Sequence, residues 1–136
     1  MAQMTWNDKM SVGVEEMDGD HQELIALLNE IDASVAADQS RDATNEIIDR
    51  LMKSVKAHFD REQDLLEKSG FAGAAAHHRE HDEMLRTARD WQAHFKDASF
   101  SKLSLEAVSG FQSWLDNHIQ GADMLYGPHL NAMGIR

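Results

Sequence analysis

The sequence predicts an all-α fold, an up-down-up-down antiparallel four-helix bundle with an extended N-terminal arm and a short C-terminal helix. Apolar residues recur every three or four positions along four separate stretches, which is the period of an amphipathic helix. The chain has a single proline, Pro128, and proline is the strongest helix breaker. The breaks between the stretches are short, and short connections favour antiparallel neighbours.

The elements follow from these stripes in chain order. Residues 1–17 are expected to form the arm, and residues 126–133 a short final helix. The four apolar stripes cover 17–35, 47–66, 77–95 and 108–122. The breaks at 37–40, 70–73 and 97–101 are polar or contain glycine, and Gly70 is well placed to end the second helix. No linker or repeat divides the chain, so residues 1–136 are expected to form a single domain.

The composition excludes several classes of function. Acidic residues outnumber basic ones 24 to 13, and the resulting net charge of −11 disfavours nucleic acid and anionic membranes. The chain has no cysteine, so disulfides, iron–sulfur clusters and thiol chemistry are ruled out. It shows no signal-peptide pattern and no apolar run near ~20 residues. We therefore expect a soluble, cytoplasmic protein with no nucleic-acid partner and no membrane insertion.

Seven residues with metal-ligand chemistry fall on these apolar stripes. Their spacing is a lone His, then HxxxE, HxxxH and HxxxxD: His21, His58 with Glu62, His77 with His81, and His118 with Asp123. Residues four apart share a helix face, so each such pair can point inward together. Imidazole and carboxylate without thiolate suit iron, copper or zinc. The sequence therefore predicts one metal site enclosed by four helices.

Each motif alone has an ordinary interpretation. HxxxH arises by chance in a histidine-rich chain, HxxxE is a common solvated helix pair, and a lone inward histidine is usually a hydrogen-bonded core residue. Five inward imidazoles with a buried glutamate, however, would make a costly core without a cation. The pair His118 and Asp123 needs a further assumption, because residues five apart lie ~140° apart on an ideal helix. The helix must loosen near Gly121, for example by a π-bulge.

The other histidines and the tryptophan near the site carry weaker expectations. His78 should face away from the core, because it lies ~100° around the helix from its neighbour His77. His94 and His129 are expected at the surface. Trp114 lies one turn before His118, where it either packs in the core or roofs the metal pocket.

These residues resemble the hemerythrin family, the non-haem di-iron oxygen-binding proteins, in its single-domain bacterial form, and members of the family are known examples of this bundle topology. The resemblance begins at Trp6 and covers nearly the whole chain. It is carried by Val12-Gly13-Val14, Met17-Asp18-Gly19-Asp20-His21, Leu24, Asn29, His58-Phe59-x-x-Glu62, His77-x-x-x-His81 and Trp114-x-x-x-His118-Ile119-x-x-x-Asp123-x-x-Tyr126.

The resemblance implies two iron ions, Fe2+ or Fe3+, joined by an oxygen-derived bridge. It implies that His77, His81 and His118 hold one iron and that His21 and His58 hold the other, which keeps an open position for dioxygen. Glu62 and Asp123 would bridge the two. The chain departs from the family pattern at three places that are not ligands but would change the surroundings of the metal: Asp20, Gln63 and Phe71-Ala72.

The implied function is reversible dioxygen binding for storage, transport or delivery, without catalysis. Two alternatives remain: a di-iron oxidase or peroxidase, and an oxygen sensor that acts through a partner protein. Oxygen-activating ferritin-like sites use Glu-x-x-His pairs, and this sequence has none. We also expect no further acid, tyrosine or cysteine on the inner stripes, which leaves no proton relay. In delivery, the recipient would be an oxygen-consuming enzyme.

Overall fold

The computed structural model describes residues 4–96 and 105–136, except for the side chains of residue 94 and residues 105–108. Within these ranges all regular structure is helical, which confirms the predicted fold class. The main helices are α1 (Glu15–Ala36), α2 (Arg41–Lys68), α3 (Ala74–Lys96) and α4 (Leu105–Gln120). Short elements complete the chain: the 3-10 turns η1 (Asp8–Met10) and η2 (Asp123–Leu125), and helix α5 (Gly127–Ala132).

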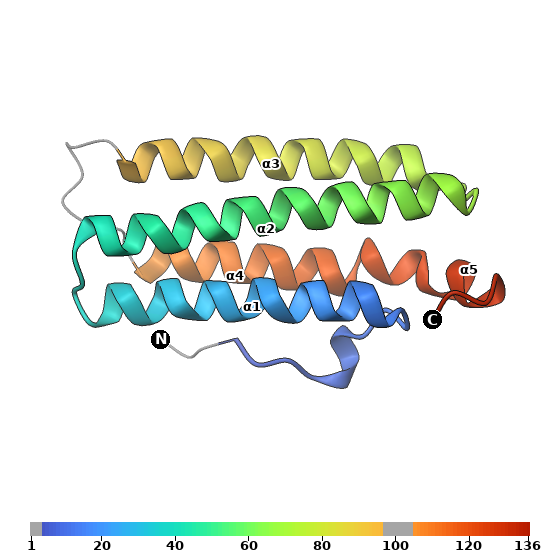
Figure 1. Ribbon diagram of the computed structural model, residues 1–136, viewed down its shortest axis with the longest axis horizontal. Helices are drawn as coiled ribbons and strands as arrows, with labels where there is room; N and C mark the ends of the chain where they lie inside the picture. The colour runs from blue at the N-terminus through green and yellow to red at the C-terminus, as the bar shows by residue number, and fades with distance from the viewer. Residues whose placement is uncertain (1–3, 97–104) are drawn as a thin grey trace.

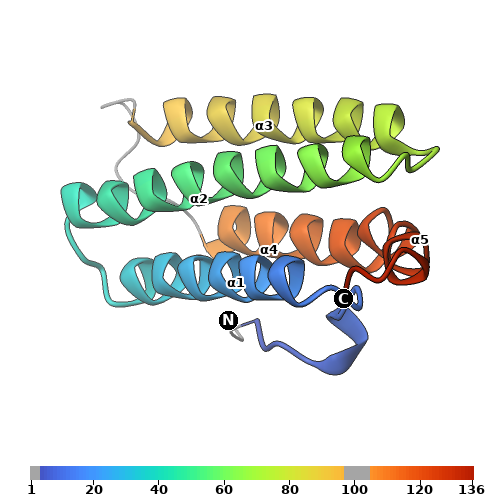
Figure 2. The ribbon, with the colours of Figure 1, turned by 45° about the vertical axis from the view of Figure 1, so that its right-hand side comes forward.

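Successive long helices run in opposite directions, as Figure 1 shows by its colour gradient. Helix α1 packs against α2 and α4, and α2 packs against α3. Figure 2, turned by 45°, keeps α2 beside α3 and α1 beside α4. None of the described helices is long and apolar enough to cross a bilayer.

Local sequence accounts for where α2 begins and ends. The Ser40 side chain accepts a hydrogen bond from the Ala43 amide at 3.1 Å, which caps the first turn. The helix stops at Lys68, and Gly70 follows with a φ of 71°, a left-handed conformation that glycine adopts without a steric penalty. The expected role of Gly70 is therefore confirmed.

The N-terminal arm is less extended than predicted. It contains η1, and α1 begins at Glu15 instead of residue 17. Hydrogen bonds hold the arm to α1: the Met4 amide donates to Asn29 Oδ1 at 2.9 Å, and Asn29 Nδ2 donates to the Met4 carbonyl at 2.7 Å. A short arm that ties its backbone to side chains of the bundle satisfies polar groups that an unpaired strand would leave open.

Among the described residues, the buried apolar side chains form two clusters, one on each side of a polar layer. The larger cluster fills the bundle and includes Leu28, Ile48 and Leu115. The smaller one closes the end formed by the arm and α5: Val12, Val14, Met17, Leu66, Tyr126 and Leu130. In α1 the order Met17, His21, Leu24 shows the transition from the smaller cluster through the polar layer to the larger cluster. The seven candidate ligands lie in this intermediate layer.

Candidate metal centre

The four long helices and η2 bring all seven candidate ligands into one buried layer. Their positions on the apolar stripes place them there. Five of them lie one turn from a buried apolar residue of the same helix: His21, His58, Glu62, His81 and His118. Their relative exposures are all small: His21 1%, His58 1%, Glu62 0%, His77 4%, His81 2%, His118 5% and Asp123 0%. Water is thus largely excluded from the centre.

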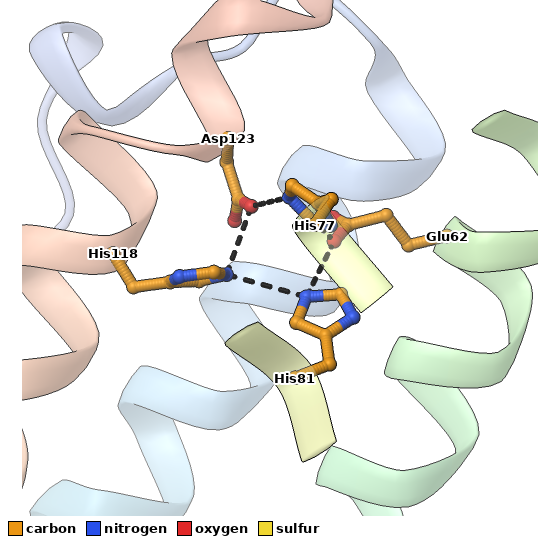
Figure 3. Close-up of side chains that lie close together, drawn as sticks. All are labelled: Glu62, His77, His81, His118 and Asp123. Atoms are coloured by element: carbon orange, nitrogen blue, oxygen red, sulfur yellow. Dashed lines mark hydrogen bonds and ion pairs between the residues drawn. The ribbon is translucent and has the colours of Figure 1, made fainter. Parts of the chain in front are cut away.

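All five imidazoles turn the same nitrogen, Nε2, toward the centre. His21 Nε2 and His58 Nε2 lie 3.1 Å apart, and His81 Nε2 and His118 Nε2 lie 3.3 Å apart. His77 Nε2 lies 2.7 Å from Asp123 Oδ1, as drawn in Figure 3. Two facing imidazole nitrogens can share only one proton between them, so this convergence fits a cation better than a hydrogen-bond network.

The two carboxylates each span the centre with their two oxygens. Glu62 Oε1 lies 2.9 Å from His81 Nε2, and Glu62 Oε2 lies 3.2 Å from His58 Nε2. Asp123 repeats the arrangement, with Oδ1 3.0 Å from His118 Nε2 and Oδ2 3.0 Å from His21 Nε2. Each carboxylate therefore offers one oxygen to each side.

Two ligand groups result, each with donor atoms within 4.8 Å of one another. One contains Glu62, His77, His81, His118 and Asp123, and the other contains His21, His58, Glu62 and Asp123. Figure 3 shows the first group converging from α2, α3, α4 and the turn that follows α4. Two groups that share two bridging carboxylates can hold a pair of ions.

Asp123 reaches the centre in a different way from the one expected. Helix α4 ends at Gln120, where the Gly121 amide makes a last helical bond to Asn117 O at 2.9 Å. The chain then turns, and Asp123 begins the 3-10 turn η2. The helix was expected to loosen near Gly121, and it ends there instead, followed by a tighter turn. The predicted π-bulge was therefore wrong. Because Asp123 belongs to the separate turn η2, it is not held at the ~140° offset from His118 that a continuous helix would impose.

Two carboxylates outside the ligand set bind the outer nitrogens of two histidines. His58 Nδ1 lies 2.9 Å from Asp20 Oδ2, and His118 Nδ1 lies 2.8 Å from Glu80 Oε1. Such partners fix which imidazole nitrogen faces a metal. Each acid directly precedes a candidate ligand in the sequence but serves a histidine on another helix. Asp20 was expected only as a departure from the family pattern, and Glu80 was not among the candidate residues.

The proton balance of the centre follows from these contacts. Burial lowers the pKa of His58, but hydrogen bonds to Asp20 and Glu62 outweigh it and raise the pKa to about 9. Burial likewise opposes the contacts of His118 with Asp123 and Glu80, which raise its pKa to about 9. Burial raises the pKa of Glu62, yet its histidine partners lower it to about 2. The pKa of Asp123 is also lowered by its histidine partners, so without metal we expect His58 and His118 to be protonated beside the ionised Glu62 and Asp123.

Tyr126 is a buried tyrosine beside the centre, and the expectation that no tyrosine lies on the inner stripes did not cover it. It is fully buried, and its hydroxyl donates to Glu62 Oε2 at 2.7 Å. Burial and the nearby carboxylates raise the pKa of the phenol, so it stays protonated. The expectation came from the four helical stripes, whereas Tyr126 follows η2 and lies outside them. A Cβ on the next residue, Gly127, would lie 2.2 Å from Val12 O, so close packing of the arm requires glycine there.

The remaining candidates lie outside the centre. His78 is 54% exposed and 3.5 Å from Asp82, as its helical phase predicted. His129 is not a simple surface residue, because it is partly buried and its ring lies 2.9 Å from the Ser69 carbonyl; α5 folds back onto the end of α2. The side chain of His94 lies outside the described residues.

Trp114 lies at the edge of the centre. It is half-buried, packs edge-to-face on Phe111 at 5.1 Å, and lines a groove between α3 and α4 together with Glu80. Of the two roles expected for Trp114, packing against the core is therefore observed. Its position beside the acid that binds His118 places it next to the centre's α4 side.

Comparison with known proteins identifies the family. Residues 12–130 match the family model of the hemerythrin HHE cation binding domain. This chain belongs to the hemerythrin family. It is 32% identical to a bacteriohemerythrin of Methylococcus capsulatus (strain ATCC 33009 / NCIMB 11132 / Bath), over 97% of this chain and 100% of that one. It is 30% identical to a bacteriohemerythrin of Stenotrophomonas maltophilia (strain R551-3), over 97% of this chain and 84% of the relative.

Solved structures agree with this assignment. A wild-type hemerythrin crystal structure aligns with a TM-score of 0.86 at 32% identity, covering 95% of this chain and 98% of the other. The His/Glu/Asp cluster therefore occupies a hemerythrin fold, in a family whose model describes a cation-binding domain.

Proposed function

We propose that this hemerythrin-family chain binds two iron ions and, through them, dioxygen reversibly. One observation carries the proposal: Glu62 and Asp123 each direct one oxygen toward each of the two histidine groups. This is the arrangement that two bridged ions require. His77, His81 and His118 would hold one iron and His21 and His58 the other. The donor set of imidazole and carboxylate suits iron.

The chemistry of the ligands favours binding over catalysis. When bound, the irons would supply the electrons that dioxygen takes up and returns. The chain's own contribution is five neutral imidazoles and two carboxylates, a set with little negative charge that favours the ferrous state. The apolar clusters on both sides exclude water. The role would be storage, transport or delivery in the cytoplasm, with an oxygen-consuming enzyme as recipient.

Tyr126 is the one observation that favours the alternative, a di-iron oxidase or peroxidase, because a buried phenol beside a ligand can donate an electron and a proton. Its hydrogen bond to Glu62 and its raised pKa, however, give it a simpler role. It holds one bridging oxygen of Glu62 and keeps its proton. Oxygen binding therefore remains the better supported function. Trp114 is proposed to limit the access of solvent to the centre from the α3–α4 side, where it lines a groove with Glu80.

Iron content and the visible spectrum test the proposal. The purified chain should carry two irons, and the reduced protein should gain an oxygen-dependent visible band that disappears on purging with inert gas. A chain with one metal, or with mainly zinc after growth in iron-rich medium, would refute the di-iron centre. Rapid irreversible oxidation with repeated turnover of peroxide would support the enzyme instead.

A further inference from the structure

A groove on the outer surface between α2 and α3 reaches one of the candidate ligands. Its cavity has a volume of about 200 Å³, and His81 and Phe59 form part of its floor. The ring of His81 stacks on that of Phe59 with centroids 3.8 Å apart. The other described cavities are lined by none of the seven candidate ligands. Since those ligands are almost fully buried, an incoming ion needs such a route.

The rim of this groove is acidic. Asp60, Asp64 and Glu67 of α2 and Asp82 of α3 line it, against one cation, Lys56. The side chains of Asp60, Asp64 and Asp82 are between 54% and 63% exposed. Their ion pairs with Lys56, Lys68 and His78 are surface contacts within one helix, which contribute little and can open. The rim can thus attract a hydrated cation and rearrange around it.

The floor of the groove adds an independent observation. Gln63 is 9% exposed, lines the groove, and its Oε1 has no hydrogen-bond partner among the described residues. Its Nε2 donates to Glu67 Oε1 at 3.0 Å and lies 3.4 Å from the Ala74 carbonyl. Both of those atoms are acceptors, so the amide orientation is fixed and the oxygen is left over. An unpaired buried carbonyl oxygen is costly unless something binds it.

His81 connects the groove with the centre. Its Nε2 faces Glu62, whereas its Nδ1 is buried and has no partner within the described chain. In Figure 3 the two ring nitrogens of His81 point in different directions, one toward Glu62 and His118 and the other away from the labelled side chains. The side chain of His81 therefore lines both the α2–α3 groove and the metal centre, and it separates the two at their nearest point.

From these contacts we propose that the α2–α3 groove is the loading route for ferrous iron. The exposed acids at the rim, Asp60, Asp64 and Asp82, concentrate the hydrated cation. Gln63 Oε1 then replaces part of its water shell, and the ion enters past Phe59 and His81. The rim is not a third resident site, since its acids do not form a close ligand group. This inference rests on the proposed di-iron centre, for which it supplies the path of the metal.

The test compares two triple variants with the same change in net charge. The groove variant is Asp60→Asn, Asp64→Asn, Asp82→Asn. The control is Glu23→Gln, Glu46→Gln, Asp90→Asn, three exposed acids outside the groove. Metal-free protein is mixed with Fe2+ without oxygen, and a fast colorimetric chelator stops uptake at set times. The groove variant should load on the order of tenfold more slowly, the control should match the wild type, and salt should narrow the gap.

Variants at the floor test the second step. Gln63→Leu should also slow loading, but with the salt dependence of the wild type, whereas Gln63→Glu keeps an oxygen and should load at least as fast as the wild type. All variants should reach the wild-type iron content. Equal rates in the groove and control variants would overturn the route alone. A lower final iron content at an unchanged rate would also overturn it, and a wild type that takes up no iron would refute the di-iron centre as well.

Discussion

On the α1–α2 side of the centre Asp20 accepts a hydrogen bond from His58, and on the α3–α4 side Glu80 accepts one from His118. The two contacts differ by only 0.1 Å, at 2.9 and 2.8 Å. Their surroundings differ far more. The side chain of Asp20 is 14% exposed, whereas that of Glu80 is 46% exposed. The same carboxylate–histidine contact is therefore buried on the α1–α2 side and open to solvent on the α3–α4 side.

Arg61 adds to this difference between the surroundings of Asp20 and those of Glu80. It donates to both oxygens of Asp20, at 2.7 and 3.1 Å, which fixes the carboxylate in its plane. Burial raises the pKa of Asp20, but its bonds to His58 and Arg61 lower it overall, so it stays charged. No described basic side chain pairs with Glu80 in this way. Water can replace a lost Glu80 contact, but it cannot easily replace Asp20.

The largest expected effect comes from deleting a ligand on the α3–α4 side. His77→Ala should lose bound iron and the oxygen-dependent band, because it removes one of the inward Nε2 atoms. His78→Ala changes the same residue type one position along the chain, at an exposed site, and should retain both. Iron content and visible spectra of the two variants measure whether each retains the metal and the oxygen-dependent band. Loss of iron in His78→Ala would contradict the assigned helix face.

The next effect concerns pH and the metal-free protein. His58 and His118, with pKa values raised from 6.5 to about 9, stabilise the fold fully below pH 6.5, and this contribution is lost as pH rises through 9. Glu62, with its pKa lowered from 4.5 to about 2, stabilises above pH 4.5 and loses this contribution as pH falls toward 2. The melting temperature without metal should therefore be highest between about pH 4.5 and 6.5 and fall at alkaline pH.

Iron should reverse the alkaline trend. Metal and proton compete for the same Nε2 atoms, so loading at neutral pH should release protons from His58 and His118. The melting-temperature difference between the loaded and metal-free proteins should then widen as pH rises from 6 to 9. Calorimetry at several pH values, with proton release followed in weak buffer, measures both. A difference independent of pH would show that these histidines are not protonated without metal.

Helical periodicity could predict which side chains turn inward. His58 and Glu62, or His77 and His81, are four residues apart, so their burial on one face follows from the geometry of a single helix. The positions of the helices themselves follow from the same stripes. Asp123 shows the limit of this argument, because the sequence does not say where α4 ends and a 3-10 turn begins.

Contacts between elements could not be read from spacing. Asp20 binds a histidine of α2 and Glu80 binds a histidine of α4, although each acid stands next to a different ligand in the sequence. The repeated pattern of an acid directly before a ligand was available as a signal. Tyr126 reaches Glu62 from beyond the last stripe, although the two are 64 positions apart in the sequence. Only the packing of α5 against the arm brings it there.

The acid pair gives the direct test of the comparison. Asp20→Asn should weaken iron binding by about 10- to 100-fold, the range for a lost partner of a metal-bound histidine. Glu80→Gln should cost several-fold at most, because solvent already reaches that side chain. Competition with a calibrated chelator measures both affinities.

A control variant separates the charge of Asp20 from the fixed orientation that Arg61 gives it. Arg61→Met keeps the acid but removes its clamp, so it should fall between Asp20→Asn and the wild type. In the double variant the loss of Arg61 should add little, because both residues act through His58. Equal losses for Asp20→Asn and Glu80→Gln would mean that burial does not distinguish the two sides.

The smallest effect is expected where the α3–α4 side is already open. Trp114 covers part of the groove beside Glu80, and its ring rests on Phe111. Trp114→Ala should leave iron content unchanged but speed the loss of the oxygenated form several-fold, since water and anions would reach the centre through the enlarged groove. Decay of the visible band in air measures this rate. Trp91→Ala is the matched control, because Trp91 also packs on Phe111, with ring centroids 5.3 Å apart, and does not line that groove. If both variants decay alike, Trp114 acts through packing alone; if only Trp114→Ala decays faster, the open side of the centre is where solvent enters.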